Sequence, residues 1–282
     1  MIRYENCQNV DPDKIYEAFS VGFSDYIVKM EKTKDEFFKI FFGQEGNDIK
    51  YSFIALDEDK PVGLILGGIK DYEGIKTLRC GGLCVDPDYR GKGVSHDLFE
   101  LHKGLALENN CKQLFLEVIG ENHRAIKFYL NKGYEKVYIL KYYTCKKLGE
   151  IRYKTNNDIT INEIVFDKLI SLDIRNIHIN WQNDFDYIKK LEGLKHYGAY
   201  VNDKLIGAIS VNKKGSIFFI WVDDKYRHKG IGSSLLIKVI NELKLEVLNI
   251  SFPSNTSLEG FVKKMNFQKL KLFQYEMYLT LD

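Results

Sequence analysis

Two runs rich in arginine, lysine and glycine are the part of this sequence best suited to binding an anion. The first is Tyr89-Arg90-Gly91-Lys92-Gly93, and the second, in the other half of the chain, is Tyr226-Arg227-His228-Lys229-Gly230. Each run follows an apolar, strand-like segment and precedes a segment with helical periodicity. A glycine turn at the start of a helix leaves backbone N–H groups open to an anion, so each run predicts a phosphate-binding turn.

The segments on both sides of the first run predict an α/β arrangement. Asp11 can cap a helix that begins at Pro12, and residues 33–42 have the pattern of a second helix. Three short strands in the order of an antiparallel meander then lead into the run, and a helix, a continuous apolar strand and another helix follow it. These elements are expected at residues 51–56, 61–70, 77–85, 94–105, 113–119 and 122–131.

The second half of the chain repeats this order in a shorter form, which supports a duplicated architecture. Residues 146–158 are polar and lack periodicity, and they are the expected linker. We therefore predict two domains, residues 1–145 and 159–282, each a mixed, mostly antiparallel sheet flanked by helices in an α/β fold of the α+β type. The second domain is expected to have strands at 197–202, 205–212, 216–222 and 247–252 and helices at 230–243 and 255–265.

The composition narrows the classes of partner. With 41 basic and 39 acidic residues the formal net charge is +2, which gives no broad attraction to nucleic acid. No apolar stretch approaches the length of about 20 residues that a membrane span needs, and the N-terminus lacks a signal-peptide core. We therefore expect a cytoplasmic protein without a membrane partner. The five cysteines lack CxxC spacing and the histidines lack ligand spacing, so free thiols and no metal are expected.

An ordered set of residues after the first turn carries a family resemblance. It consists of Leu116-Glu117-Val118, then Asn122-His123-Arg124-Ala125-Ile126-Lys127-Phe128-Tyr129, then Gly133-Tyr134. With the meander and the turn, this set resembles the GNAT superfamily of N-acetyltransferases. The phosphate turn of that family reads Gln or Arg, any two residues, Gly, any residue, then Gly or Ala, and it holds the pyrophosphate of acetyl-coenzyme A.

The resemblance covers residues 1 to about 145 well and residues 159–282 less fully. In the second part it rests on Arg227-His228-Lys229-Gly230-Ile231-Gly232 and on Asn255-Thr256-Ser257-Leu258-Glu259-Gly260-Phe261-Val262. It implies two tandem GNAT-like domains and an N-acetyltransferase that transfers the acetyl group of acetyl-coenzyme A to an amine.

By this resemblance, backbone N–H groups at the end of the third strand hold the thioester carbonyl, and the turn holds the pyrophosphate. Ser95 stands where glycine or alanine is usual, but it keeps the backbone N–H group that an anion needs. Arg90 and Lys92 are expected to assist, and Asn122 to contact the coenzyme as well as cap a helix. The expected coenzyme-binding residues are Leu83, Cys84, Val85, Arg90, Gly91, Lys92, Gly93, Val94, Ser95 and Asn122.

The resemblance assigns Tyr129 as the acid that protonates the departing thiolate. The second copy has Val262 at the same distance from its asparagine, and valine cannot donate a proton, so residues 1–145 are the predicted catalytic domain. Glu117 could deprotonate the amine directly or through water, recognise a cationic substrate, or be a partly exposed carboxylate at a strand end. Cys84 could be a nucleophile, but no histidine and acid support it, so direct attack of the amine is expected.

The acceptor is the least defined part of this interpretation. In this family, helices after the first strand shape the acceptor pocket, which makes Phe23, Asp25 and Tyr26 candidates for substrate binding. Core packing explains Phe23 equally well, and Asp25 could simply face water. The acceptor could be a small-molecule amine or a protein amine, and the chain a monomer with an internal pseudo-dimer or a homodimer. A non-catalytic acetyl-coenzyme A sensor and activity in the C-terminal domain are the alternatives.

Overall fold

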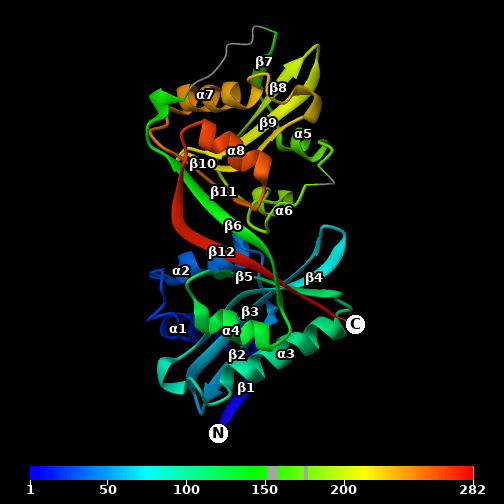
Figure 1. Ribbon diagram of the computed structural model, residues 1–282. Coiled ribbons are helices and arrows are strands. Elements are labelled where there is room, and N and C mark those ends of the chain that lie inside the picture. Colours follow the sequence, from blue (N-terminus) through cyan, green and yellow to red (C-terminus); the bar gives the residue numbers. More distant parts are fainter. Residues whose placement is uncertain (152–157, 175–176, 282) are drawn as a thin grey trace. The chain divides into compact units, whose positions relative to one another are not determined.

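The computed structural model describes residues 1–151, 158–174 and 177–281. The chain forms two compact units (Figure 1): unit 1 contains Met1–Val137 and Tyr275–Asp282, and unit 2 contains Tyr138–Gln274. The division falls inside two long strands, β6 (Glu135–Cys145) and β12 (Gln268–Thr280). The predicted domain bounds, 1–145 and 159–282, stay a prediction, and residues 152–157 of the expected linker lie outside the described residues.

The sheet of unit 1 has the strand order β1-β2-β3-β4-β5, followed by the part of β12 that belongs to this unit. Neighbouring strands from β1 to β4 are antiparallel, as the predicted meander requires, whereas β4 and β5 are parallel. The predicted mixed α/β class is therefore confirmed. The strands are β1 (Ile2–Asn6), β2 (Asp48–Asp57), β3 (Lys60–Tyr72), β4 (Ile75–Val85) and β5 (Gln113–Ile119), and the helices are α1 (Pro12–Gly22), α2 (Lys34–Phe37), α3 (Val94–Glu108) and α4 (His123–Asn131).

Local capping explains where the helices of unit 1 begin. The side chain of Asp11 accepts a hydrogen bond from the backbone N–H of Asp13, which starts α1 at Pro12 as predicted. Thr33 and Glu36 form a reciprocal capping box at the start of α2. This helix continues as a π-helical segment, Phe38–Gln44, so the predicted second helix is present but changes its hydrogen-bonding pattern midway.

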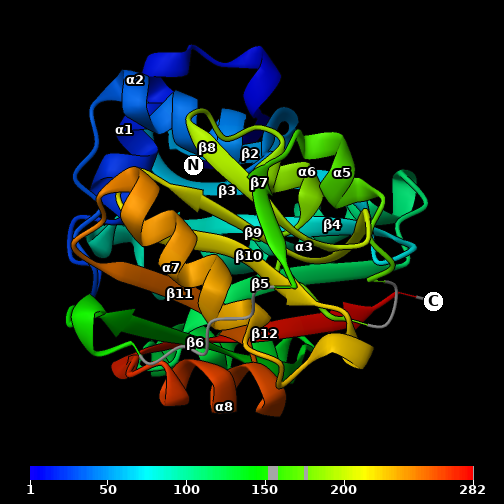
Figure 2. The same cartoon turned by 90° about the horizontal axis from the view of Figure 1, so that it is seen from above.

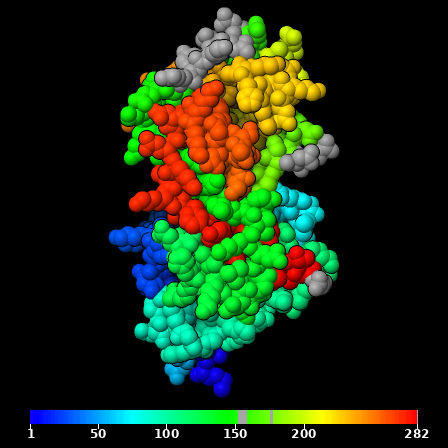
Figure 3. Space-filling view, viewed as in Figure 1, coloured from blue at the N-terminus to red at the C-terminus, as the bar shows by residue number. Residues whose placement is uncertain are grey.

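Helices cover the two faces of the unit 1 sheet. One core cluster joins α3 and α4 to the strands and includes Cys80, Leu116, Val118 and Tyr129. A second cluster joins α1 and α2 to the strands and includes Cys84. Side chains of α3 and α4 lie over the face that Figure 3 presents. Because side chains alternate along a strand, Glu117 lies on the face opposite Leu116 and Val118.

β4 and β5 separate after four paired residues. Their parallel register runs from Thr77 opposite Gln113 to Cys80 opposite Leu116 and then stops, although both strands continue. The pairing of β4 with β3 shifts at the same point, where Gly81 is an extra residue between the partners of Leu66 and Gly67. This β-bulge bends β4 away from β5 and reverses its side-chain alternation, so Cys80 and then Leu83 face the α3–α4 cluster.

Unit 2 repeats this arrangement in the strand order β6-β11-β10-β9-β8-β7. Figure 2 shows α7 and α8 on one side of these strands and α5 and α6 on the other, in agreement with two separate core clusters. β10 also has a bulge, at Phe218, and its parallel pairing with β11 stops at Ile217. The elements are β7 (Thr160–Glu163), β8 (Leu194–Val201), β9 (Lys204–Asn212), β10 (Ser216–Val222), β11 (Leu248–Pro253), α5 (Phe166–Ile170), α6 (Phe185–Ile188), α7 (Ile231–Leu243) and α8 (Thr256–Lys264).

The positions of all five cysteines are described, and each is a buried free thiol, which confirms that prediction. In the described part of the chain, no helix combines the length and the apolar character that crossing a membrane would require.

The bulge in β4 requires a residue without a side chain. A Cβ atom added to Gly81 would lie 2.0 Å from Oδ1 of Asn47, whose side chain is buried. We expect Gly81→Ala to lower the free energy of unfolding by about 1–3 kcal/mol, measured by urea denaturation. Gly43→Ala is the control, because no heavy atom lies within 4 Å of its added Cβ. Equal denaturation midpoints for the two variants would contradict this account of the bulge.

Candidate active site

The first basic and glycine-rich run forms an open turn at the start of α3. Gly91 and Gly93 have φ angles of +75° and +88°, a left-handed conformation that glycine adopts without strain. Gly93 is the N-cap of α3 and provides no side chain to cap the helix, so the first backbone N–H groups of the helix, including that of Ser95, stay open. The turn can therefore hold a phosphate group through backbone N–H groups and the helix dipole.

The end of β4 presents backbone groups toward the side from which β5 has separated. The N–H of Asp86 donates to the carbonyl of Val62 on β3. Because hydrogen-bonded pairs alternate along antiparallel strands, Leu83 and Val85 direct their N–H and C=O groups away from β3, whereas the N–H of Cys84 faces β3. Of the three residues predicted to hold a thioester carbonyl, Leu83 and Val85 thus have suitably directed N–H groups, and Cys84 does not.

Arg90 connects the turn with the strand end and with the loop after α1. Its Nε donates to the carbonyl of Val85 at 3.2 Å, and its two terminal nitrogens pair with both carboxylate oxygens of Asp25 at 2.5 and 2.6 Å. The hydrogen bonding of Asp25 with the Arg90 guanidinium lowers the pKa of Asp25. The guanidinium therefore organises the turn from within the protein, while Lys92 lies over the ring of Tyr89 and is exposed.

Tyr129 and Glu117 lie on opposite faces of the sheet at the point where β4 and β5 separate. The hydroxyl of Tyr129 is 3.8 Å from Sγ of Cys80, and only 7% of the residue is exposed. Burial, with smaller effects of Cys80 and Tyr134, raises the pKa of Tyr129 well above its usual value. The phenol therefore keeps its proton at neutral pH, as an acid for a leaving group must.

Glu117 forms a buried ion pair. Its Oε2 accepts a hydrogen bond from Arg79 at 2.8 Å, and its side chain is 3% exposed. Burial raises the pKa of Glu117 to about 7, against the opposing effect of Arg79. A carboxyl group with a pKa near neutrality can accept a proton from an amine and release it to water.

The three candidate acceptor residues lie close to these groups. The ring of Phe23 lies 3.6 Å from where a Cβ of Gly82 would be, beside the bulge. Burial raises the pKa of Tyr26, and the neighbouring side chain of Asn122 has a smaller, opposing effect. Asn122 also caps α4 by accepting from the N–H of Ala125 at 3.1 Å. The structure thus places Phe23, Asp25 and Tyr26 around the strand end, the turn and the start of α4.

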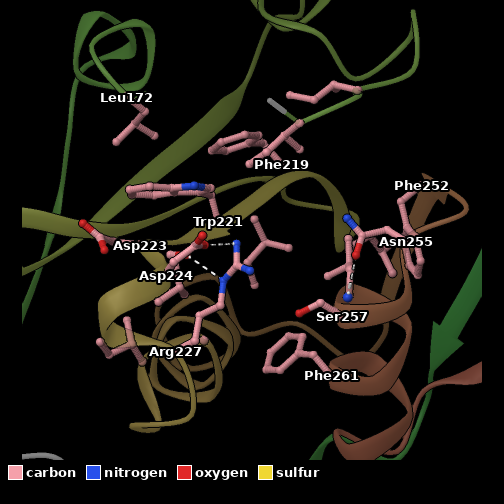
Figure 4. A pocket seen from close by; sticks show the side chains of 18 of the residues that line it. Leu172, Phe219, Trp221, Asp223, Asp224, Arg227, Phe252, Asn255, Ser257 and Phe261 are labelled. Carbon is pink, nitrogen blue, oxygen red and sulfur yellow. Dashed lines mark hydrogen bonds and ion pairs between the residues drawn. The ribbon is translucent and has the colours of Figure 1, made fainter. Parts of the chain in front are cut away.

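Unit 2 contains a pocket of about 1500 Å³ beside the second turn (Figure 4). His228 and Gly230 have φ angles of +62° and +86°, which reproduces the backbone of the first turn. Arg227 donates to the carbonyl of Val222 at 3.1 Å, as Arg90 does to Val85, but it pairs with Asp224 of its own turn at 2.6 Å. Phe219, Trp221 and Asn255 also line the pocket.

The ionisable side chains of the first site are replaced by serine or apolar residues at the matching positions of unit 2. In sheet register, Ser216 and Ile217 take the positions of Arg79 and Cys80, and Ser251 takes that of Glu117. Val262 takes the position of Tyr129, seven residues after the helix N-cap, and packs in the same apolar cluster as Ile217. The backbone of the site is repeated, but the tyrosine and the glutamate are not.

Comparison with known proteins identifies the family. The model of the acetyltransferase (GNAT) family matches residues 13–134 and 166–267, which together are more than half of the chain. The chain belongs to the GNAT acetyltransferase family. The GNAT assignment is consistent with both copies of the phosphate turn, since each matched range contains one of them.

Individual relatives agree with the GNAT assignment. An uncharacterized N-acetyltransferase of Methanocaldococcus jannaschii is 28% identical over 150 residues, which are 50% of this chain and 65% of that protein. A tandem GNAT protein from the clavulanic acid biosynthesis pathway has a TM-score of 0.71 at 12% identity, with 99% of this chain and 98% of that chain covered. A GCN5-related N-acetyltransferase from Sphaerobacter thermophilus has a TM-score of 0.70 at 12% identity, with 99% and 95% covered. Both structures share the tandem GNAT-like fold of this chain.

Sequence reasoning missed three residues that contact the predicted site residues Glu117 and Tyr129 or their partners. Arg79, which holds Glu117, lies in a strand where a lone arginine resembles an exposed residue. Glu45, which also pairs with Arg79, follows the π-helical segment without any motif. Cys80 was counted only as a free thiol. The one available signal was the unusual pairing of charges, Arg79 and Glu117, in two otherwise apolar strands.

Burial of the thiols makes a covalent cysteine route testable. Burial raises the pKa of Cys80 to about 11, and Cys84 donates to the carbonyl of Ala18 at 3.6 Å. We expect no rapid reaction of the native protein with a disulfide reagent at pH 8, whereas the unfolded chain should react at all five thiols. Rapid modification of one thiol in the native state would contradict this expectation and favour an acyl-cysteine route.

Proposed function

We propose that unit 1 is an N-acetyltransferase that moves the acetyl group of acetyl-coenzyme A directly to a primary amine. The observation that carries the proposal is the separation of β4 and β5, with Glu117 and Tyr129 on opposite faces and the open turn beside them. A thioester carbonyl near the end of β4 would lie between a base and an acid. The GNAT assignment supports the reaction class, and the side chains support its location.

The proposed residues would act in one connected sequence. Glu117 accepts a proton from the attacking amine through its free oxygen, and the amine nitrogen forms a bond with the carbonyl carbon. The N–H of Leu83, which is directed away from β3, donates to the oxyanion that develops. Tyr129 gives its proton to the sulfur as the carbon–sulfur bond breaks. Proton exchange with water then restores the Glu117 carboxylate and the Tyr129 phenol.

The acceptor is proposed to be an amine that approaches along the α1–α2 face, where Glu117 lies. Phe23 and Tyr26 offer aromatic surface there, and Asp25 is already paired with Arg90. Asp25 is therefore proposed to hold the loop rather than the substrate ammonium. Small-molecule and protein amines both satisfy this description.

A second candidate function concerns unit 2, whose pocket favours binding without chemistry. Its turn has the backbone of a phosphate site, but Ser216, Ile217, Ser251 and Val262 replace the reactive groups of unit 1. If unit 2 binds the coenzyme without turnover, it is an acetyl-coenzyme A sensor.

Substitutions in the two turns show which of the two units carries the activity. We expect Gly93→Asp to abolish release of coenzyme A from acetyl-coenzyme A across a panel of amines, amino acids and aminoglycosides, because a carboxylate would occupy the phosphate position. Gly230→Asp is the matched control, since its φ of +86° is close to the +88° of Gly93 and the backbone strain is similar. Loss of activity in Gly230→Asp but not in Gly93→Asp would show that the activity resides in unit 2. Tight binding of acetyl-coenzyme A without any turnover would support the sensor.

The acid is tested by removal of one oxygen atom. We expect Tyr129→Phe to reduce kcat by about 10²-fold or more, because the leaving thiolate loses its proton donor. Binding of acetyl-coenzyme A, measured by calorimetry, should change little, since the ring and its packing remain. Unchanged kcat in Tyr129→Phe would exclude Tyr129 as the acid.

A further inference from the structure

Glu117 belongs to a buried group of ions whose other two members, Arg79 and Glu45, have no role in the proposed reaction. The guanidinium of Arg79 pairs with Oε2 of Glu117 at 2.8 Å through one nitrogen and with Oε2 of Glu45 at 2.7 Å through another. The side chains of Arg79, Glu45 and Glu117 are 6%, 11% and 3% exposed. Charges so far from water interact strongly, because little solvent screens them.

The three side chains come from separate elements of unit 1. Arg79 lies in the paired part of β4, Glu117 lies in β5 just beyond the last paired residue, and Glu45 is the C-cap that follows the π-helical segment. Glu276 on β12 and Tyr72 on β3 also interact electrostatically with Glu117. Arg79 is thus a fixed cation among several acidic groups, and it is shared between two carboxylates.

The carboxylate of Glu117 keeps one oxygen open. Oε1 is buried and has no hydrogen-bond partner among the described residues, while Oε2 is held by Arg79. One oxygen is therefore fixed in place, and the other could take up a proton without breaking a hydrogen bond to a described residue.

The duplicated unit provides an internal comparison. Ser216 and Ser251 stand in the register positions of Arg79 and Glu117, so unit 2 lacks the arginine and the glutamate together. An arginine that served only to bridge the ends of these strands would be equally useful in both copies. Its presence beside the candidate base alone connects it with the chemistry of that base.

We propose that Arg79 and Glu45 are positioning residues that act through Glu117: Arg79 fixes one carboxylate oxygen and favours the ionised form, and Glu45 limits this effect by sharing the guanidinium. The inference rests on the proposed function only where Glu117 accepts the proton of the amine. Its consequence is that the two residues shift the ionisation of Glu117 in opposite directions.

The signs follow from the charges. Without the Arg79 cation the Glu117 carboxylate is less favoured, so its pKa rises and the base becomes active only at higher pH. Without the Glu45 charge the guanidinium acts on Glu117 alone, so its pKa falls and the base is active at lower pH. A residue with a purely structural role would lower the rate without moving the pH profile in a direction set by its charge.

The test is the pH dependence of kcat/KM in Arg79→Gln and Glu45→Gln. We expect the acidic limb to move up by about one to three pH units in Arg79→Gln and down by about one unit in Glu45→Gln. Arg79→Lys, which keeps the charge, should restore most of the wild-type position. The ionisation of the substrate amine is the same for every variant, so it cannot cause these shifts.

Arg3→Gln and Glu5→Gln are matched controls, because they remove the same charges from a pair on β1. Neither control variant should shift the acidic limb of the pH dependence of kcat/KM. If Arg79→Gln does not fold, the isosteric Glu45→Gln alone decides the matter. An unmoved limb in Glu45→Gln, or a shift of both variants in the same direction, overturns the proposal.

A second readout keeps this inference separate from the proposed function. Protein carrying 13C at the glutamate side-chain carboxyls is titrated by NMR, and the Glu117 signal is assigned by its absence in Glu117→Gln. Opposite shifts of the Glu117 pKa in the two variants support the ionic arrangement even if no amine is turned over, whereas turnover with an unmoved pKa refutes it and leaves the proposed function standing.

Discussion

The site depends on the end of pairing between β4 and β5. Parallel strands that stayed paired would use the N–H and C=O groups of both edges in their own ladder. The bulge at Gly81 stops this pairing after Cys80 and Leu116, so Leu83 and Val85 keep backbone groups directed away from β3. Tyr129 lies beside this separation on one face of the sheet, and Glu117 lies beside it on the other.

The duplication shows which features of the candidate site come from the backbone and which from the side chains. Unit 2 repeats the bulge, the early end of parallel pairing, the left-handed turn and the arginine that donates to the preceding strand. It has Val262 in place of Tyr129, and Ser216 and Ser251 in place of Arg79 and Glu117, so it lacks the tyrosine and both charges. The backbone geometry of a phosphate-binding turn can therefore persist without the side chains proposed for proton transfer, so two such turns do not imply two active sites.

Features encoded within a few residues could be predicted from sequence, and contacts between distant segments could not. The bounds of β5 and β10, the caps at Asp11 and Asn122, and the contrast between Tyr129 and Val262 all follow from local pattern and spacing. The pairing of Arg79 with Glu45 and Glu117 joins residues 34 and 38 positions apart, and Arg90 meets Asp25 across 65 positions. No periodicity marks such pairs, because only the folded sheet brings them together. For the same reason, the sequence does not predict that Tyr275–Asp282 belongs to unit 1.

The central claim is that proton transfer in unit 1, and not coenzyme binding alone, produces the activity. The most direct test is the rate of coenzyme A release by the double variant Glu117→Gln/Tyr129→Phe, compared with its affinity for acetyl-coenzyme A. The account predicts a rate lower by about 10³-fold or more with affinity changed little, because both proton-transfer groups are removed and the turn at Gly93 is intact. A rate close to that of the wild-type protein would show that the chemistry takes place elsewhere.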